Sequence, residues 1–151
     1  MVYGVPFATD TEVEEALEAA ACDFIDEGNI DRAFEKGFAL SGGQQARVAL
    51  ARGLLQAKKT ASVLLLDEPC AALDAESEAR VLASVSRIVE THKLACLLVT
   101  HRLQHAAEVA SRIVCLKDGK GVEAGTHAEL LGRGGLYSSL YRLQHPDGGG
   151  G

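Results

Sequence analysis

Apolar residues recur every three or four positions along much of the chain, which is the spacing that places them on one face of an α-helix. Three of these runs open with a capping box, in which a Ser or Thr is followed three residues later by Glu or Gln. The boxes begin at Thr9, Ser41 and Thr126, and Asp74 can cap a further helix. The pattern predicts helices over about residues 10–26, 42–57, 75–91, 103–110 and 136–144, with a short one after residue 126.

Three short apolar runs lack this spacing and end abruptly, as strands do. Residues 62–67 and 94–100 are almost purely apolar, which is typical of strands buried on both faces of a parallel sheet. Residues 113–116 predict a third strand, and the turn sequence that begins at Lys117 predicts a short antiparallel strand over 121–123. Because strands and helices alternate here, the sequence predicts an α/β fold with a parallel sheet.

Composition places the chain among globular proteins. Of its 151 residues, 47% are hydrophobic and 24% are charged, and the formal net charge is −6. This hydrophobic content argues against a wholly disordered chain, and the acidic balance argues against a basic nucleic-acid-binding module. No run reaches the roughly 18 apolar residues of a membrane-spanning helix, and we expect no secretory leader.

The four cysteines are spaced neither as CxxC pairs nor with histidines as zinc ligands. They are Cys22, Cys70, Cys96 and Cys115. A disulfide framework is unexpected in a chain this apolar. We therefore expect four reduced thiols, buried or half-buried, in a cytosolic protein.

Two carboxylates follow the first predicted strand directly. Asp67 and Glu68 would lie at the carboxyl end of that strand, where open α/β sheets bind ligands. There Asp67 could hold Mg²⁺ through water, since Mg²⁺ prefers few carboxylates and keeps its waters. Glu68 could orient or deprotonate an attacking water. Taken alone, the pair could also be an ordinary acidic turn after a strand.

A glycine-rich segment, Leu40-Ser41-Gly42-Gly43-Gln44, precedes the second predicted helix. Glycine lets the backbone approach a ligand closely. The free N–H groups and the dipole at a helix start favour an anion such as phosphate, and Ser41 adds a hydroxyl donor. The alternative for such a segment alone is a capping box behind a flexible turn.

Two further positions could contact a nucleotide. His101 directly follows the predicted strand 94–100 and could hydrogen-bond a γ-phosphate, although a lone histidine at a strand end is more often structural. Asp74, at the end of Ala72-Leu73-Asp74, could equally be no more than a helix cap after a turn.

Taken together and in this order, these features resemble the ATP-binding cassette (ABC) ATPase family. Leu40–Gln44 resembles the family signature, and Val63–Glu68 resembles its Walker B motif with the catalytic glutamate. Ala72–Asp74 is similar to the D-loop, and His101 is similar to the switch histidine. The resemblance covers about residues 3–145.

The sequence that flanks these motifs is similar to exporter-type cassettes. The similar segments are Tyr3-Gly4 with Ala8-Thr9 and Glu12-Val13, Asp23–Ile25, Thr100–Leu103, Gly121–Leu131, and Gly135–Tyr137 with Leu140 and Gln144. In that family such a cassette lies in the cytosol below membrane-spanning helices. The resemblance therefore implies a location at the cytoplasmic face of a membrane, as part of a transporter.

The resemblance also implies a fold and a division of the chain. The fold is a P-loop NTPase-type parallel sheet with flanking helices, together with an α-helical subdomain. Residues 1–61 would form the helical subdomain with the signature, and residues 62–131 would form a portion of the ATPase core. Residues 132–151 would form the C-terminal helix and a glycine-rich tail.

The roles of the site residues follow from the same resemblance. It implies ATP and Mg²⁺ as cofactors, with Asp67 as the metal ligand and with Glu68 and His101 as catalytic residues. Leu40, Ser41, Gly42, Gly43, Gln44 and Asp74 would bind the nucleotide. In the family the signature contacts ATP that the opposite cassette holds. The expected partners are therefore a second nucleotide-binding domain and the transmembrane domains of a transporter.

One departure from the family pattern concerns the phosphate-binding P-loop, G-x-x-x-x-G-K-[ST]. The Gly-Lys pair of this sequence is Gly119-Lys120, with Val114 in place of the first glycine and Gly121 in place of Ser or Thr. It is not a P-loop. The family's P-loop strand should precede residue 1, so we expect an incomplete sheet with an exposed apolar edge and face.

The leading hypothesis is the C-terminal part of an ABC exporter's ATPase domain, which couples ATP hydrolysis to export. An alternative is a truncated, non-hydrolysing cassette that pairs with or regulates a complete ABC protein through its signature face. A third is a soluble ABC-type ATPase of the DNA-repair or chromosome class. The exporter-like C-terminal sequence and the acidic balance argue against the third, so no nucleic-acid partner is expected.

Overall fold

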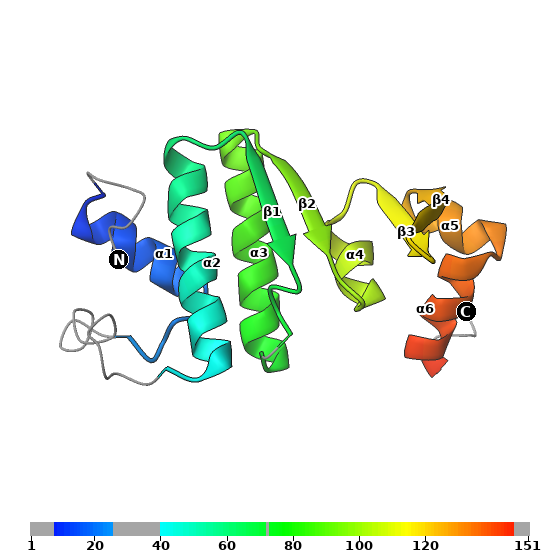
Figure 1. Cartoon of the computed structure of the whole chain (residues 1–151), viewed down its shortest axis with the longest axis horizontal. Helices are drawn as coiled ribbons and strands as arrows, with labels where there is room; N and C mark the ends of the chain where they lie inside the picture. The colour runs from blue at the N-terminus through cyan, green and yellow to red at the C-terminus, as the bar shows by residue number, and fades with distance from the viewer. Residues whose placement is uncertain (1–7, 26–39, 72, 147–151) are drawn as a thin grey trace. The chain divides into compact units, whose positions relative to one another are not determined.

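The structure, a computed structural model of the chain, describes residues 8–25, 40–71 and 73–146 (Figure 1). The elements of this part of the chain are α1 (Asp10–Ala19), α2 (Gly42–Lys59), β1 (Val63–Asp67), α3 (Ala75–His92), β2 (Ala95–Val99), α4 (Leu103–Val109), β3 (Ile113–Lys117), β4 (Lys120–Gly125), α5 (His127–Arg133) and α6 (Leu136–Gln144). None of these helices is both long and apolar enough to cross a bilayer.

The contacts divide the chain into two units, which meet between Val99 and Thr100. This boundary follows packing, whereas the predicted divisions after residues 61 and 131 follow motifs and stay predictions. The weakly specified segment around residues 29–39, for which the sequence suggests a short helical turn, lies outside the described residues.

The first unit is a helical layer joined to a parallel pair of strands. Helices α1, α2 and α3 pack against one another, and α2 also contacts β1 (Figure 1). Strands β1 and β2 pair in parallel, with Val63 opposite Ala95 and Asp67 opposite Val99. Apolar side chains from all three helices and from β1 are buried, among them Leu17, Leu54, Leu55, Leu64, Val81 and Ile88. The predicted α/β class with a parallel sheet is confirmed.

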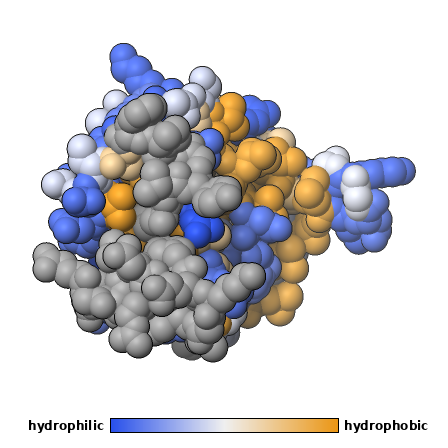
Figure 2. Space-filling view, turned by 60° about the vertical axis from the view of Figure 1, so that its left-hand side comes forward, coloured by the Kyte–Doolittle hydropathy of each residue, from blue (hydrophilic) through white to orange (hydrophobic). Residues whose placement is uncertain are grey.

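The prediction that both parallel strands are buried on both faces is wrong, whereas the expected exposed apolar face of an incomplete sheet is confirmed. Leu64 and Leu66 of β1 are buried, but Leu65 between them is 70% exposed, and Leu97 of β2 is 59% exposed. Because neighbouring side chains of a strand point to opposite faces, the described part of the chain covers only one face of β1. Hydrophobic side chains accordingly reach the surface over a broad area (orange in Figure 2).

Helix α1 ends seven residues earlier than the predicted span of 10–26, at Ala19. Ala21 has a φ of 54°, in the left-handed region that cannot continue a helix. The N–H of Ala21 donates to the carbonyl of Glu18 (3.0 Å), and the N–H of Cys22 donates to the carbonyl of Leu17 (2.9 Å). These two bonds form a Schellman motif, which closes the helix and turns the chain away from its axis.

The second unit contains the β3–β4 hairpin and helices α4 to α6. Asp118 and Gly119, with φ values of 51° and 72°, form a two-residue turn of the kind that joins antiparallel strands. Strand β3 therefore pairs with β4 in a separate antiparallel sheet. The prediction that it adds a third strand to the parallel sheet is wrong, because a partner two residues away in sequence is available to it. Ile113, Leu130 and Tyr137 form the buried core.

Helix α6 begins with a carboxylate from β4 instead of a cap from its own sequence. The N–H groups of Leu136 and Tyr137 donate to the two oxygens of Glu123, at 2.7 and 2.9 Å. Gly135 precedes the helix, and a Cβ at that position would overlap the Glu123 carboxylate. Glycine at residue 135 therefore leaves the space that the capping carboxylate occupies.

The four cysteines are free thiols, as predicted, but they are not all shielded. Cys22 and Cys70 are buried and Cys115 is half-buried, whereas Cys96 on β2 is exposed. The expectation of four buried or half-buried thiols is therefore wrong at Cys96, which lies on the incompletely covered sheet. Burial raises the pKa of the Cys22 thiol to about 11.

Candidate functional site

The glycine-rich segment forms the capping box that the sequence predicts. The N–H of Gln44 donates to Oγ of Ser41 (3.3 Å), and the N–H of Ser41 donates to Oε1 of Gln44 (2.9 Å). The carbonyl of Leu40 accepts a hydrogen bond from Nε2 of Gln45 (3.0 Å). A Cβ at Gly42 would meet no atom within 4 Å. The first turn of α2 is therefore ordered by its own side chains, while the backbone at Gly42 is open to a ligand.

Glu68 has an unusual backbone conformation at the carboxyl end of β1. Its φ is 45°, in the left-handed region, which costs a residue other than glycine about 1–3 kcal/mol. Its N–H donates to the carbonyl of Val99 at the end of β2 (2.9 Å), and this bond holds the residue beside both strands. Asp67, the last residue of β1, is exposed. Backbone strain of this kind is concentrated at functional sites.

A pocket of about 150 Å³ lies between the start of α2 and the end of β1. Its lining includes Gly42, Gly43, Ala46, Arg47, Glu68, Pro69, Ala71 and Leu73. The structure thus brings two of the predicted phosphate-binding residues, Gly42 and Gly43, together with the predicted base Glu68. Asp67 is not part of the described lining.

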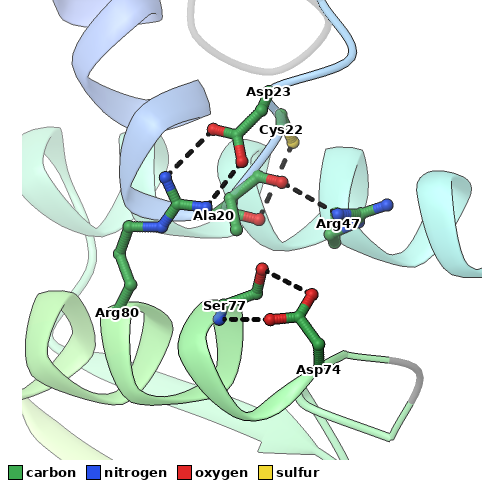
Figure 3. Close-up of polar contacts among 8 residues, drawn as sticks. Ala20, Cys22, Asp23, Arg47, Asp74, Ser77 and Arg80 are labelled. Atoms are coloured by element: carbon green, nitrogen blue, oxygen red, sulfur yellow. Dashed lines mark hydrogen bonds and ion pairs between the residues drawn. The ribbon is translucent and has the colours of Figure 1, made fainter.

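Asp74 has the capping geometry that the sequence offers as an alternative to ligand binding. Its Oδ1 accepts the N–H of Ser77 (2.9 Å) and its Oδ2 accepts the hydroxyl of Ser77 (3.0 Å), which caps helix α3 (Figure 3). These bonds, the backbone bond first, lower the pKa of the Asp74 carboxyl. Its nucleotide contact stays a prediction, and Ala72 of the same motif lies outside the described residues.

His101 belongs to the second unit, where its main chain is tied to the last helix. The side chain of Gln144 donates from Nε2 to the carbonyl of His101 (2.7 Å) and accepts from the N–H of Leu103 (2.9 Å). This pair of bonds fixes the chain on both sides of Arg102, at the start of α4. The exposed His101 imidazole takes no part in them. Its predicted catalytic role stays a prediction.

The carboxylate at the end of β1 suits an ion such as Mg²⁺, which does not need a preformed site made of several protein ligands. Across residues 8–25, 40–71 and 73–146, no three His, Cys, Asp or Glu side chains gather closely enough to hold a metal ion. Mg²⁺ commonly takes one or two carboxylates and completes its shell with water and substrate phosphates. The exposed Asp67 carboxylate at the sheet edge suits that role.

Arg47 is a residue of the pocket that the sequence reasoning missed. It lies one helical turn after Gly43, so the two positions share a face of α2. Its Nη1 donates to the carbonyl of Ala21 (3.0 Å), and its guanidinium carbon lies 4.7 Å from the centre of the Phe24 ring. A basic residue four positions after a candidate phosphate-binding glycine is the sequence signal that could have identified it.

Comparison with known proteins gives a consistent result. A family model described as "ABC transporter" matches residues 6–71, which include the capping box and Asp67-Glu68. The mitochondrial potassium channel ATP-binding subunit of Xenopus tropicalis is 44% identical over 96% of this chain and 21% of its own length. An ATP-dependent lipid A-core flippase of Dechloromonas aromatica is 44% identical over 91% of this chain and 23% of its own length.

The structural comparison extends this similarity to the fold. The solved structure of a bacterial Atm1-family ABC exporter with ATP bound superposes with a TM-score of 0.78 and 33% identity. It covers 95% of this chain and 25% of the exporter chain. The chain belongs to the ABC transporter family. This ABC chain spans about a fifth to a quarter of the length of these relatives, and its fold matches part of an exporter-type nucleotide-binding domain.

Proposed function

We propose that this chain is part of the ATPase domain of an ABC exporter and couples ATP binding and hydrolysis to export. The observation that carries the proposal is the placement of Glu68, whose N–H donates to the carbonyl of Val99 and thereby holds the residue at the ends of two parallel strands. The open backbone at Gly42, suited to phosphate, is a separate surface that can meet a nucleotide held by another cassette. The likeness to exporter cassettes supports the same reading.

Each site residue then has a defined task. The Glu68 carboxylate accepts a proton from the attacking water, whose oxygen forms a bond to the γ-phosphorus as the bond to the ADP oxygen breaks. Asp67 would hold Mg²⁺ through water, and the ion would supply charge neutralisation on the phosphates. His101 hydrogen-bonds the γ-phosphate. Asp74, while capping α3, faces the nucleotide with its remaining lone pairs.

The signature segment acts on a nucleotide held by another cassette. Ser41 and the backbone of Gly42 and Gly43 donate hydrogen bonds to its phosphate oxygens. The P-loop that holds the nucleotide is supplied from outside these 151 residues, in which the motif does not occur. The partners are a second nucleotide-binding domain and the transmembrane domains of the transporter, with the site at the cytoplasmic face of the membrane.

The test is ATP hydrolysis by a completed cassette, made by joining this chain to the P-loop-bearing half of an ABC exporter's ATPase domain. We expect Mg²⁺-dependent hydrolysis that Glu68→Gln abolishes, because glutamine keeps the shape but cannot accept the proton. Nucleotide binding should survive this substitution. Hydrolysis by Glu68→Gln at the unmodified rate would exclude Glu68 as the base.

Two other outcomes are informative. A completed cassette that pairs with a second cassette but never hydrolyses ATP would favour the non-hydrolysing alternative. One that neither binds nor hydrolyses ATP, while folding as judged by circular dichroism, would overturn the proposed function.

A further inference from the structure

Two arginines from different helices bind the short segment that follows α1. This linking segment is defined as residues 20–24. Arg47 of α2 donates to the carbonyl of Ala21, and its guanidinium lies over the Phe24 ring. Arg80 of α3 binds both carboxylate oxygens of Asp23, at 3.1 and 2.5 Å (Figure 3). One segment of five residues thus ties the signature-bearing helix to the helix that Asp74 caps.

The contact with Arg47 depends on how α1 ends. In a continuing helix the carbonyl of residue 21 would accept the N–H of residue 25. The left-handed Ala21 instead ends the helix and leaves this carbonyl to accept from Nη1 of Arg47. The same turn carries Phe24 to the face of the guanidinium. Both contacts therefore require the Schellman turn at residues 20–22.

Arg47 lies where its orientation affects the signature. It is four residues after Gly43 and lines the pocket that contains Gly42 and Glu68. Its Nε is buried and has no hydrogen-bond partner among the described residues. The two contacts with the linking segment therefore fix the guanidinium plane, and with it the first turns of α2.

We propose that Arg47 is a positioning residue for the signature. By holding the first turns of α2 against the linking segment, it sets the direction in which Ser41, Gly42 and Gly43 present their donors. Arg80, through Asp23, keeps the start of α3 in register with them. The proposal rests on the proposed function, in which the signature contacts a nucleotide, but its structural part can be tested without nucleotide.

The structural test is hydrogen exchange on the full chain. Arg47→Met should speed exchange of the Gln44, Gln45 and Ala46 amides about tenfold through local opening of the first turn, with little change at Leu54 and Leu55. Arg47→Lys keeps the charge and can keep the hydrogen bond to the Ala21 carbonyl, but it loses the planar group over Phe24. It should therefore increase the exchange rate of these amides by less than Arg47→Met does. Phe24→Leu should resemble Arg47→Lys. Arg52→Met, on the same helix, is the matched control and should leave these amides unchanged.

The functional test uses the completed cassette and separates two binding steps. Arg47→Met should weaken ATP-dependent pairing of cassettes about tenfold, equivalent to ~1.4 kcal/mol, while binding of ATP to a single cassette changes less than about twofold. Arg47→Lys should recover part of the pairing. A loss of folding alone would weaken both ATP binding by a single cassette and the pairing of cassettes. It would also affect Arg47→Lys and Arg47→Met alike.

The outcomes distinguish the two proposals. Unchanged exchange at residues 44–46 in Arg47→Met overturns the positioning role, whatever the nucleotide chemistry. Equal losses in pairing and in single-cassette binding also overturn it. Faster exchange in Arg47→Met, combined with an unmodified completed cassette that fails to bind ATP, supports the positioning of α2 and rejects the proposed function. If Arg47→Met does not fold, Arg47→Lys and Phe24→Leu carry the same comparison.

Discussion

Ser41 and Gln44 cap each other, so that each side chain accepts the other's backbone N–H at the start of α2. The Ser41 hydroxyl is an acceptor in this bond and keeps its own proton, which it can donate to a phosphate oxygen. Stability and ligand binding thus use different parts of one hydroxyl group. Substitutions at residue 41 can therefore separate the two roles.

The first prediction concerns Ser41→Asp and Ser41→Ala. Aspartate is an effective N-cap and its charge is favourable at a helix start, so Ser41→Asp should keep the free energy of unfolding near that of the unmodified chain. It cannot donate to phosphate and repels it, so ATP-dependent pairing of completed cassettes should be lost. Ser41→Ala should lower the free energy of unfolding by about 0.5–2 kcal/mol. Urea denaturation and a pairing assay measure both effects.

A chain with Ser41→Asp that pairs as well as the unmodified one would show that the signature does not contact phosphate. Gly42→Asp is a second probe of the same surface. A Cβ at Gly42 would meet no atom within 4 Å, so the start of the new side chain meets no atom of this chain and a loss of pairing would point to an incoming ligand.

The second prediction concerns the cap of α6. Gly135→Ala places a methyl group where the Glu123 carboxylate lies, so the carboxylate must move away from the N–H groups of Leu136 and Tyr137. Hydrogen bonds to a charged group contribute about 1.5–3 kcal/mol, and we expect a loss of about that size in the free energy of unfolding of the second unit. Thermal denaturation followed by circular dichroism measures it.

The double variant Glu123→Ala/Gly135→Ala discriminates this mechanism from a general intolerance of alanine at residue 135. Once the carboxylate is removed, Gly135→Ala should cost little, so the two effects should not add. Gly132→Ala is the matched control: it lies in α5 with no atom within 4 Å of the added carbon, and it should be neutral or stabilising. Additive losses in the double variant would contradict the assigned cap.

Part of this structure could be predicted from local sequence and part could not. Caps at Thr9, Ser41 and Thr126 depend on residues three positions apart, and all three form as predicted. The early end of α1 depends on a left-handed Ala21, a conformation that alanine does not favour and that no local pattern indicates. The strands and the β3–β4 hairpin could be recognised from short apolar runs and the turn at Lys117, but which strands share a sheet could not, because that is decided by residues far apart in sequence.

The candidate site shows the same division. Ser41 to Gln44 and Asp67-Glu68 could be found because each motif is contiguous, but that Gly42, Gly43 and Glu68 line one pocket was not predicted. Arg47 escaped because its partner Ala21 lies 26 residues away. Its spacing from Gly43 indicates only that the two residues share a face of α2, whereas its contacts with Ala21 and Phe24 are tertiary and have no local signal.

The third prediction concerns acid stability. Hydrogen bonds from Ser77 lower the pKa of the Asp74 carboxyl from its ordinary value, and hydrogen bonds from the Lys59 and Lys58 ammonium groups lower the pKa values of Glu12 and Glu15. A carboxylate with a lowered folded pKa stabilises the fold above its unfolded pKa and loses this contribution as the pH falls through the folded value. The melting temperature should therefore be constant between pH 5 and 7 and fall below about pH 4.5.

Asp74→Asn separates the contribution of Asp74 to acid stability from those of Glu12 and Glu15. Asparagine caps a helix about as well as aspartate but does not titrate in this range. The variant should therefore fold at pH 7 and lose less stability than the unmodified chain as the pH falls below the ordinary pKa of an aspartate. An identical pH profile for the two chains would show that the capping bonds of Asp74 do not lower its pKa.

The last prediction concerns the parallel strands, whose uncovered face makes them the weakest part of the first unit. Leu65 and Leu97 leave most of their surfaces in water, and Val63 and Val99 are about half exposed. At about 25 cal/mol per Å², a few hundred Å² of uncovered apolar surface forfeits several kcal/mol, which is a large share of the ~5–15 kcal/mol of a typical domain. The helices α1, α2 and α3 bury their apolar faces against one another and depend on the sheet much less.

In the chain alone, we therefore expect the amides of Leu65 and Leu98 to exchange faster than that of Ala49 in α2. We also expect helical circular dichroism to persist above the temperature at which the strands open. In the completed cassette, where further chain is available to cover the sheet, protection at Leu65 should rise while that at Ala49 stays the same. Stronger protection at Leu65 and Leu98 than at Ala49 in the chain alone would mean that the two strands are stable with one face uncovered, and it would favour a chain that functions in this short form.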